Sequence, residues 1–276
     1  MRPLGEANPF QHFATLNRSP VKGRALIASG PVELTFLGTG AAVAPAAYNV
    51  SMLVDRTLLL DAGAPLSVHL PRVGVSLSSP QAVVFTHFHA DHTFGLAWLI
   101  LGRILLDQPP PPLTIVGPTG ARAYVDQLVE FAWGPEMLQL ARERRQLEVE
   151  EIVPGEEISV AGYRLTAYRM EHSSRFPCLG YVLAGRDVRL GYSGDAEASA
   201  GLESLLSACD HAVVEMTYEK PGPMHLSVAE VEELLKRHPS VRFILTHLGT
   251  DRSISGALAA RDFLTVRLPL PPTPDR

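Results

Sequence analysis

Cysteine is scarce in this chain, and its scarcity excludes two common ways of stabilising a fold. The 276 residues contain only Cys178 and Cys209, which lie far apart and outside any metal-spacing pattern. Two isolated cysteines cannot build the disulfide framework of a small secreted domain, nor a cysteine-rich zinc site. The simplest interpretation is a protein that works in a reducing compartment.

Long hydrophobic runs are also missing. The longest apolar stretch, residues 96–106, is interrupted by Gly102 and Arg103. It is too short to cross a bilayer, which takes about 20 apolar residues. Residues 1–19 contain no uninterrupted apolar segment of the kind that signal peptides carry. We therefore expect no membrane contact and a cytoplasmic location.

The chain has no excess of positive charge, with 24 basic and 29 acidic residues and a net charge of −5. This balance gives no electrostatic argument for nucleic-acid binding, although a local basic patch is compatible with it. A small anionic substrate is also compatible, because bound dications would dominate the field of their own cleft. Hydrophobic residues make up 46% of the chain, which is typical of a globular protein with a large core.

Three histidines and one aspartate stand within six consecutive positions of the segment 86–92, which reads Thr-His-Phe-His-Ala-Asp-His. The apolar residues 82–85 before it predict a buried strand, and the apolar residues 93–106 after it predict a mostly buried helix. Imidazole and carboxylate together suit zinc and neighbouring transition metals. Four ligands so close together exceed the needs of one catalytic metal with an open position, so they predict two metals. These four candidate ligands are His87, His89, Asp91 and His92.

The same arrangement, an apolar strand that ends on a histidine or a carboxylate, recurs along the chain. It is found at His172, Asp195, Glu215 and His247. Because open sheets gather their sites beyond strand ends, we expect one composite site. Asp61 also follows an apolar strand, where it is either a turn residue or an acceptor that orients a metal-binding histidine, and we favour the acceptor. The histidines without this context are interpreted as structural: His12, His69, His211 and His238.

The chain is predicted to fold as one large α/β domain between two short flanking segments. Four prolines interrupt residues 1–31, which we interpret as an N-terminal extension. Regular strand and helix patterns occupy residues 32–267, and a proline-rich tail follows at 268–276. Within the domain, Pro118 is expected to open a helix.

These residues resemble the metallo-β-lactamase superfamily and, within it, the ribonuclease Z-like branch. The match runs in order from Phe36 to Gly249 and rests first on the His-x-His-x-Asp-His motif at 87–92. Further segments resemble that branch: Phe36-Leu37-Gly38-Thr39-Gly40, Asn49-x-Ser51, Leu60-Asp61-x-Gly63, Ser193-Gly194-Asp195, and Glu215 paired with His225 ahead of a helix.

The resemblance implies an α/β (α+β) fold, a four-layer αββα sandwich, in which residues 32–267 form a hydrolase domain. By analogy, His87, His89 and His172 would bind one metal, Asp91, His92 and His247 would bind another, and Asp195 would bridge both. The cofactors would then be two divalent metal ions. Zinc is the first expectation, and manganese or iron tolerates the same ligands.

The chain departs from the tRNA-processing members of this branch at one place. Those enzymes carry a protruding glycine- and proline-containing arm between the third histidine and the bridging aspartate. Here only residues 173–194 separate His172 from Asp195, enough for one hairpin. We therefore expect a small anionic ester substrate rather than tRNA, as in armless phosphodiesterases that act on small or cyclic nucleotide-like esters. A homodimer is favoured only as the commonest assembly.

The expected reaction is phosphodiester hydrolysis by a hydroxide held between the two metals. Asp91 could accept a proton from the attacking water as well as bind metal. His225, oriented by Glu215, is the candidate general acid for the leaving group, since a carboxylate partner favours protonated imidazole. Arg252 is equally a candidate phosphate contact or an ordinary loop arginine.

Two other functions remain open at this point. The same metals could hydrolyse a carboxyl ester, a lactone or a thioester, a reaction that has less need of the Glu215–His225 pair. The chain could also be a non-hydrolytic metal-binding accessory protein of cofactor biosynthesis, because one fold hosts many functions.

Overall fold

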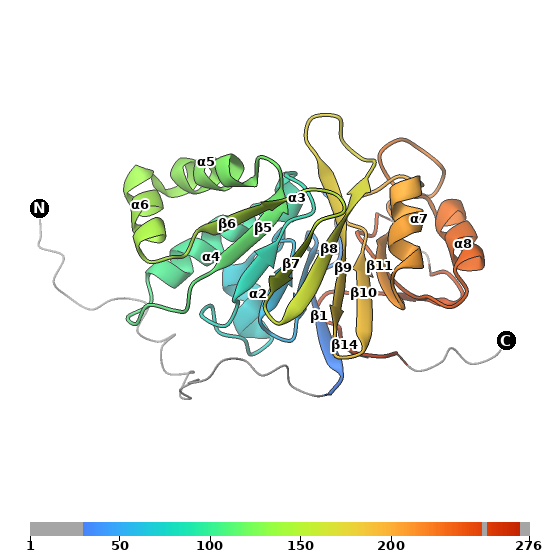
Figure 1. Cartoon of the computed structure of the whole chain (residues 1–276), viewed down its shortest axis with the longest axis horizontal. Helices are drawn as coiled ribbons and strands as arrows, with labels where there is room; N and C mark the ends of the chain where they lie inside the picture. Colours follow the sequence, from blue (N-terminus) through green and yellow to red (C-terminus); the bar gives the residue numbers. More distant parts are fainter. Residues whose placement is uncertain (1–29, 250–252, 271–276) are drawn as a thin grey trace, which may run out of the picture.

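Two seven-stranded sheets pack against each other at the centre of the molecule (Figure 1). The computed structural model describes residues 30–249 and 253–270. In order across the first sheet, the strands are β14 (Thr265–Leu268), β1 (Val32–Gly38), β2 (Ser51–Val54), β3 (Leu58–Leu60), β4 (Ala82–Val84), β5 (Thr114–Pro118) and β6 (Glu148–Ile152). Across the second sheet they are β13 (Ala257–Ala259), β12 (Arg242–Thr246), β11 (His211–Glu215), β10 (Val188–Tyr192), β9 (Cys178–Gly185), β8 (Tyr163–Met170) and β7 (Glu157–Val160).

Helices cover the outer face of each sheet. The helices are α2 (Leu66–Arg72), α3 (Ala90–Thr93), α4 (Gly95–Ile104), α5 (Ala121–Trp133), α6 (Pro135–Glu143), α7 (Ala200–Ser207) and α8 (Val228–Arg237). Buried residues of α2, α4, α5 and α6 pack with those of the first sheet, and buried residues of α7 and α8 pack with those of the second. The predicted four-layer αββα sandwich is confirmed.

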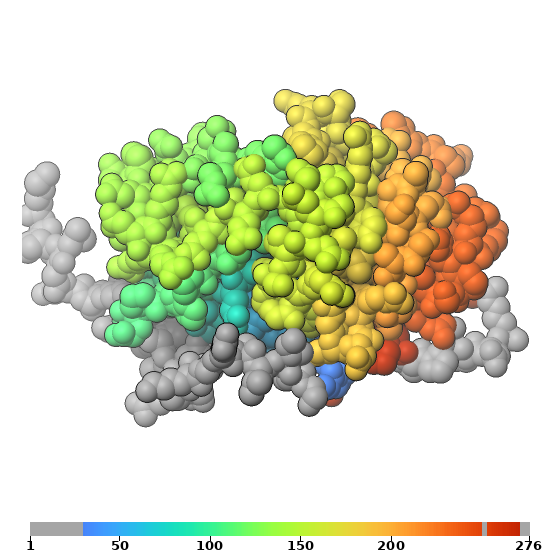
Figure 2. Space-filling model, in the orientation of Figure 1, coloured from blue at the N-terminus to red at the C-terminus, as the bar shows by residue number. Residues whose placement is uncertain are grey.

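Three apolar clusters fill the three interfaces between these layers. The central cluster joins residues such as Phe36 of the first sheet and Tyr181 of the second, both fully buried. Strands covered on both faces need no polar alternation, and β11 is accordingly buried along its whole length. In the space-filling view, the two halves are in direct contact, and the loop between β8 and β9 projects at the top (Figure 2).

One predicted helix start was wrong. Pro118 does not open a helix, because it is the last residue of β5 and lies opposite Ile152 of β6. Helix α5 begins at Ala121, after Gly120 with a φ of 96°. That backbone conformation favours glycine, so the turn between strand and helix is made by Gly120 rather than by the proline.

The first and last strands of the described residues, β1 and β14, pair with each other. Strand β14 runs antiparallel to β1, with Leu268 opposite Val32. The predicted extension, residues 1–31, lies outside the described residues except for its last two, and the predicted tail, 268–276, is described only to residue 270. Both therefore stay predictions. Within the described residues, no helix is both long enough and apolar enough to span a bilayer.

Four strands of the second sheet end at the same edge of the sandwich. Strands β10, β11 and β12 pair in parallel, and β8 points the same way because both it and β10 are antiparallel to β9. Glu215 is the last residue of β11, and His172, Asp195 and His247 follow the carboxyl ends of β8, β10 and β12 within three residues. The direction of the strands therefore brings together four residues that lie far apart in the sequence.

The first sheet contributes the segment 86–92 to the same edge. This segment follows β4, and two hydrogen bonds tie its first residue, Thr86, and the preceding Phe85 to β9 of the other sheet. Leu179 N donates to the Thr86 carbonyl oxygen at 2.9 Å, and the Tyr181 hydroxyl donates to the Phe85 carbonyl oxygen at 2.8 Å. The predicted strand-to-helix turn thus lies directly against the strand ends of the second sheet.

Candidate metal centre

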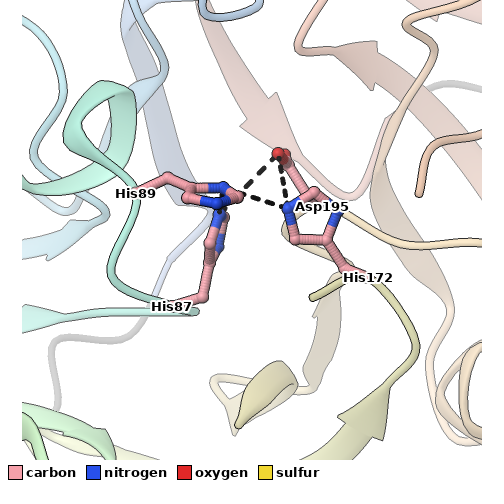
Figure 3. Close-up of side chains that lie close together, drawn as sticks. All are labelled: His87, His89, His172 and Asp195. Carbon is pink, nitrogen blue, oxygen red and sulfur yellow. Dashed lines mark hydrogen bonds and ion pairs between the residues drawn. The ribbon is translucent and has the colours of Figure 1, made fainter. Parts of the chain in front are cut away.

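Three imidazoles and one carboxylate converge at the first half of the site (Figure 3). His89 Nδ1 lies 3.0 Å from His87 Nε2 and 3.1 Å from His172 Nε2. Asp195 Oδ2 lies 3.8 Å from His87 Nε2 and 3.6 Å from His172 Nε2. One atom from each residue can be chosen so that all lie within 4.8 Å of one another, a group that could hold a metal ion.

A second group shares Asp195 with the first. Asp195 Oδ1 lies 3.2 Å from His92 Nε2 and 3.3 Å from His247 Nε2, and His247 Nε2 lies 3.2 Å from Asp91 Oδ2. The two oxygens of Asp195 therefore face different groups. The structure brings together all seven residues predicted as ligands, in two groups of four with one member in common.

The outer ring nitrogens of two histidines contact oxygens that can only accept. His172 Nδ1 lies 2.7 Å from the Met224 carbonyl oxygen, and His92 Nδ1 lies 2.8 Å from Asp61 Oδ2. Each Nδ1 must therefore carry a hydrogen and donate it. In the neutral ring, Nε2 then keeps its lone pair facing the cluster, which is the arrangement of a metal-binding histidine.

Two threonines assign the same tautomer to His87 and His247. Thr86 Oγ1 donates its hydrogen to Asp61 Oδ2 at 2.9 Å. It can therefore only accept a hydrogen bond from His87 Nδ1, which lies 3.0 Å away. Thr217 Oγ1 donates to Glu215 Oε2 at 2.6 Å and accepts from His247 Nδ1 at 2.9 Å. All four of these rings thus direct an Nε2 lone pair into the cluster.

Two of the converging atoms are buried without a hydrogen-bond partner among the described residues: His92 Nε2 and Asp195 Oδ1. In the neutral tautomer, their lone pairs face each other at 3.2 Å. An unsatisfied buried polar atom costs about 1–3 kcal/mol, and a cation between the two atoms would remove that cost. Imidazole nitrogen and carboxylate oxygen are ligands that zinc accepts. The residues present therefore fit a divalent metal.

The electrostatics of the cluster also favour a cation. Burial raises the pKa of Asp195, but the positive charges of His247 and His92 lower it well below its ordinary value. Burial lowers the pKa of His92, yet Asp195 and Asp61 together raise it well above its ordinary value. Burial keeps the pKa of His87 low, so that this ring is neutral. A dication that bound here would displace the proton that the carboxylates hold on His92.

Glu215 and His225 form the predicted pair beside the two groups. His225 Nδ1 lies 2.9 Å from Glu215 Oε1 and 3.8 Å from Asp195 Oδ2. Ala196 N donates to the same Glu215 oxygen at 2.9 Å. Burial lowers the pKa of His225, but the hydrogen bond to Glu215 and the charges of Glu215 and Asp195 raise it above its ordinary value. The side chain of His225 is 16% exposed, so its ring is accessible at the edge of the cluster.

Comparison with known proteins agrees with this fold. A family model described as anti-Pycsar protein Apyc1 matches residues 32–263. The chain belongs to the anti-Pycsar protein Apyc1 family. It is also similar to ribonuclease Z of Listeria monocytogenes serotype 4b (strain CLIP80459), with 31% identity over 180 residues, 63% of this chain and 56% of the relative. This Apyc1-family chain spans about half the length of the curated relatives it matches.

Solved structures share the fold of the Apyc1-family chain. The metallo-β-lactamase fold protein YhfI from Bacillus subtilis has a TM-score of 0.71 at 16% identity, covering 86% of this chain and 99% of that protein. A diphosphatase from the PhnP family has a TM-score of 0.68 at 17% identity, covering 87% of this chain and 98% of that protein. The chain therefore has the metallo-β-lactamase fold and is similar in sequence to ribonuclease Z.

Asp61 is the acceptor that the sequence favoured. Besides the hydrogen bond from His92 Nδ1, it accepts hydrogen bonds from Thr86 N at 2.8 Å and from the Tyr192 hydroxyl at 2.6 Å.

The turn that carries Asp61 has a constrained backbone. Asp61 has a φ of 54°, and a Cβ placed on Gly63 would lie 1.7 Å from the Asp91 carbonyl oxygen. Only glycine fits at that position beneath the metal motif, which explains the Asp-x-Gly sequence of the turn.

Between His172 and Asp195, this Apyc1-family chain has only a short projecting loop and one hairpin, and no long arm. Residues 173–194 are all described, and they form a loop, the antiparallel pair β9–β10 and the turn between its strands. Aromatic rings line this side of the site instead. The ring of Phe176, from the loop, lies 5.0 Å from that of His89 and 5.6 Å from that of Phe88.

Several residues of the site were missed from the sequence. The acceptor roles of Thr86 and Thr217, the Tyr192 hydroxyl and the Met224 carbonyl oxygen depend on contacts between distant segments. Thr217 alone carried a local signal, because it follows a strand that ends on a carboxylate. The predicted phosphate contact at Arg252 and the structural interpretation of His12 lie outside the described residues.

Proposed function

We propose that this protein is a phosphodiesterase that uses two divalent metal ions and hydrolyses a small anionic phosphodiester. The observation that carries the proposal is the Glu215–His225 pair, 2.9 Å apart, at the edge of two ligand groups that share Asp195. A carbonyl hydrolase has less need of such a pair, whereas the alkoxide that leaves phosphorus needs a proton.

The metal ligands are assigned from the two groups. One ion would be held by His87, His89, His172 and Asp195, and the other by Asp91, His92, His247 and Asp195. When bound, two dications lower the pKa of water and neutralise charge on the phosphoryl oxygens. Zinc suits this donor set best, and manganese or iron would also bind.

Protons are handled by side chains at the edge of the site. Burial raises the pKa of Asp91, but its hydrogen bond with His247 and the charge of His92 lower it below its ordinary value. Asp91 is thus a carboxylate that can accept a proton from the attacking water. His225, held protonated by Glu215, donates a proton to the leaving oxygen.

A small substrate is preferred over RNA for two reasons. The segment between His172 and Asp195 holds only one hairpin, so this region offers no arm for grasping a folded RNA. The net charge of −5 also gives no general attraction for a polyanion.

The test compares two diesters of one nucleotide, one with a p-nitrophenyl leaving group and one with an alkyl leaving group. In His225→Ala, we expect kcat for the alkyl diester to fall about 100- to 10,000-fold, the usual worth of general acid catalysis. The p-nitrophenyl diester should lose less than about 10-fold, because p-nitrophenolate leaves without a proton. The matched control is His238→Ala, which removes another histidine that lies 2.7 Å from a glutamate, Glu203.

Three results would overturn the proposal. Turnover of an activated carboxyl ester or a lactone, indifferent to His225 and with no diester hydrolysis, would indicate the carbonyl hydrolase. Absence of turnover on all these esters, with two metals bound per chain, would indicate the non-hydrolytic role. Faster cleavage of a tRNA precursor than of either nucleotide diester would contradict the small substrate.

A further inference from the structure

The loop that carries His225 is held at its base by backbone contacts. Residues 219–225 leave β11 and return to α8, and Thr217 N and Tyr218 N both donate to the Leu226 carbonyl oxygen at 3.1 and 3.0 Å. Near its carboxyl end, Met224 has a φ of 73°, a conformation that non-glycine residues rarely adopt. Such a residue stays in place only when its surroundings fix it. The residue directly before His225 therefore needs partners.

The side chains of Glu197 and His172, which follow β10 and β8 of the second sheet, form hydrogen bonds with the backbone of Met224. Its N–H donates to Glu197 Oε1 at 2.5 Å, and its carbonyl oxygen accepts from His172 Nδ1 at 2.7 Å. Glu197 N in turn donates to the Glu171 carbonyl oxygen at 2.7 Å. Since Glu171 precedes His172 in the chain, these contacts close a ring. The ring links the loop of the candidate acid to one of the candidate metal ligands.

Glu197 also stands in a segment that holds the other half of the acid pair. Asp195 belongs to both ligand groups, Ala196 N donates to Glu215 Oε1 at 2.9 Å, and Glu197 holds Met224. Three consecutive residues thus fix the shared carboxylate, the glutamate and the loop of the histidine. A displacement of Glu197 would change the distance between His225 and Glu215 without touching either residue.

We propose that Glu197 is a positioning residue for proton donation: its carboxylate fixes the Met224 peptide and thereby holds His225 against Glu215. This inference rests on the proposed role of His225 as the acid. The bond is charge-assisted, which makes it stronger than a bond between neutral groups, and Glu197 is partly buried. Its effect on the reaction should be confined to substrates whose leaving group needs a proton.

The experiment uses Glu197→Ala and Glu197→Gln in the metal-loaded full chain, with the two nucleotide diesters above. In Glu197→Ala, we expect kcat for the alkyl diester to fall about 10- to 100-fold, as for a catalytic group displaced by about 1 Å. The p-nitrophenyl diester should change less than about 3-fold on the same reasoning. Glu197→Gln keeps an acceptor oxygen for Met224 N–H and should restore the alkyl rate. The matched control is Glu171→Ala, which removes an exposed side chain but keeps the carbonyl oxygen that Glu197 N contacts.

Two readouts besides activity separate positioning from a loss of structure. The methyl NMR signal of Met224 should shift in Glu197→Ala and return to its place in Glu197→Gln. Zinc stoichiometry should match the wild type in both variants.

Different failures identify different errors. If His225→Ala shows no dependence on the leaving group, the proposed function fails. If His225→Ala depends on the leaving group but Glu197→Ala does not, only the proposed role of Glu197 fails. Equal losses on both diesters with reduced zinc binding would mean that Glu197 acts through His172. Glu197→Gln behaving like Glu197→Ala would mean that the hydrogen bond to Met224 is not what matters. Either of these last two results overturns the inference.

Discussion

Asp61 Oδ2 lies 2.8 Å from His92 Nδ1, and both side chains are fully buried. The same carboxylate accepts hydrogen bonds from Thr86 of its own sheet and from Tyr192 of the other sheet. One residue therefore fixes the ring of a candidate metal ligand and ties the two sheets together where the site is built. The orientation of His92 is set by the packing of the sandwich rather than by the motif alone.

Asp61→Asn should weaken metal binding. Asp61 accepts hydrogen bonds from Thr86 N, Thr86 Oγ1, Tyr192 and His92. In asparagine, an NH₂ group replaces one of the two carboxylate oxygens, so a hydrogen-bond donor would face these donors. We expect zinc affinity to fall about 10- to 100-fold, the usual effect of losing a partner that orients a ligand. Isothermal titration with zinc measures this. Asp187→Asn, in the turn between β9 and β10, is the control, and equal affinities in the two variants would contradict the role of Asp61.

Tyr192→Phe should weaken both stability and metal binding. Its hydroxyl donates to a carboxylate, and loss of a hydrogen bond to a charged group costs about 1.5–3 kcal/mol. Tyr181→Phe is the matched control, because the Tyr181 hydroxyl is also buried but donates to the Phe85 carbonyl oxygen at 2.8 Å. We expect both variants to unfold at lower denaturant concentration, and only Tyr192→Phe to lose zinc affinity. Loss of affinity in Tyr181→Phe as well would indicate a general effect of the sheet interface.

Metal stoichiometry tests whether the two groups are separate. After its metals are removed and zinc is added back, the wild-type protein should bind two zinc ions per chain. His172→Ala and His247→Ala should each bind one zinc ion per chain. Removal of a metal ligand should lower zinc affinity by more than the roughly 10- to 100-fold that is lost when a residue orienting a ligand is removed. Elemental analysis after gel filtration measures the number, with His238→Ala as the control. A single ion in the wild type, or none in either variant, would exclude a shared dinuclear site.

The sequence was most informative where chemistry is concentrated in a short segment. Residues 86–92 could be recognised because four candidate metal ligands within six positions rarely occur together by chance. His172, Asp195 and His247 could be added because each follows an apolar strand. The partners behind them could not be predicted. Tyr192 reaches Asp61 across 131 positions of the chain, and only the packing of two sheets brings them together.

Arg103 shows the same limit in the core. In the sequence it interrupts an apolar helix, but in the structure it is fully buried. It donates to Gln146 Oε1 at 2.6 Å and to the carbonyl oxygens of Leu77, Pro80 and Pro111 at 2.8, 3.0 and 2.6 Å. A buried guanidinium needs such acceptors, even though burial lowers its pKa to about 10. The four consecutive prolines at 109–112, which follow α4, are thus tied to that helix at Pro111.

The two cysteines should be unreactive in the folded protein. Burial raises the pKa of Cys178 to about 11 and that of Cys209 to about 12. At pH 8 their thiolate population is then at least about 100-fold below that of a free cysteine, whose pKa is about 8.5. Ellman's reagent should therefore find almost no reactive thiol in the native protein and two after denaturation. Rapid reaction of either thiol at pH 8, without loss of structure, would contradict the burial of that side chain.

The same pKa shifts predict how stability changes at alkaline pH. A thiol whose pKa is raised by folding contributes stability that is fully present below the pKa of the unfolded state, about 8.5, and is lost as pH rises towards the folded value. The free energy of unfolding should therefore fall between about pH 8.5 and 12. Buried tyrosines with raised pKa values, such as Tyr192, add to this fall, so the comparison must be made with Cys209→Ala. We expect the variant to lose less stability than the wild type between pH 8 and 10.5, measured by urea unfolding. Parallel curves for the two proteins would mean that Cys209 ionises as easily in the folded chain as in the unfolded one.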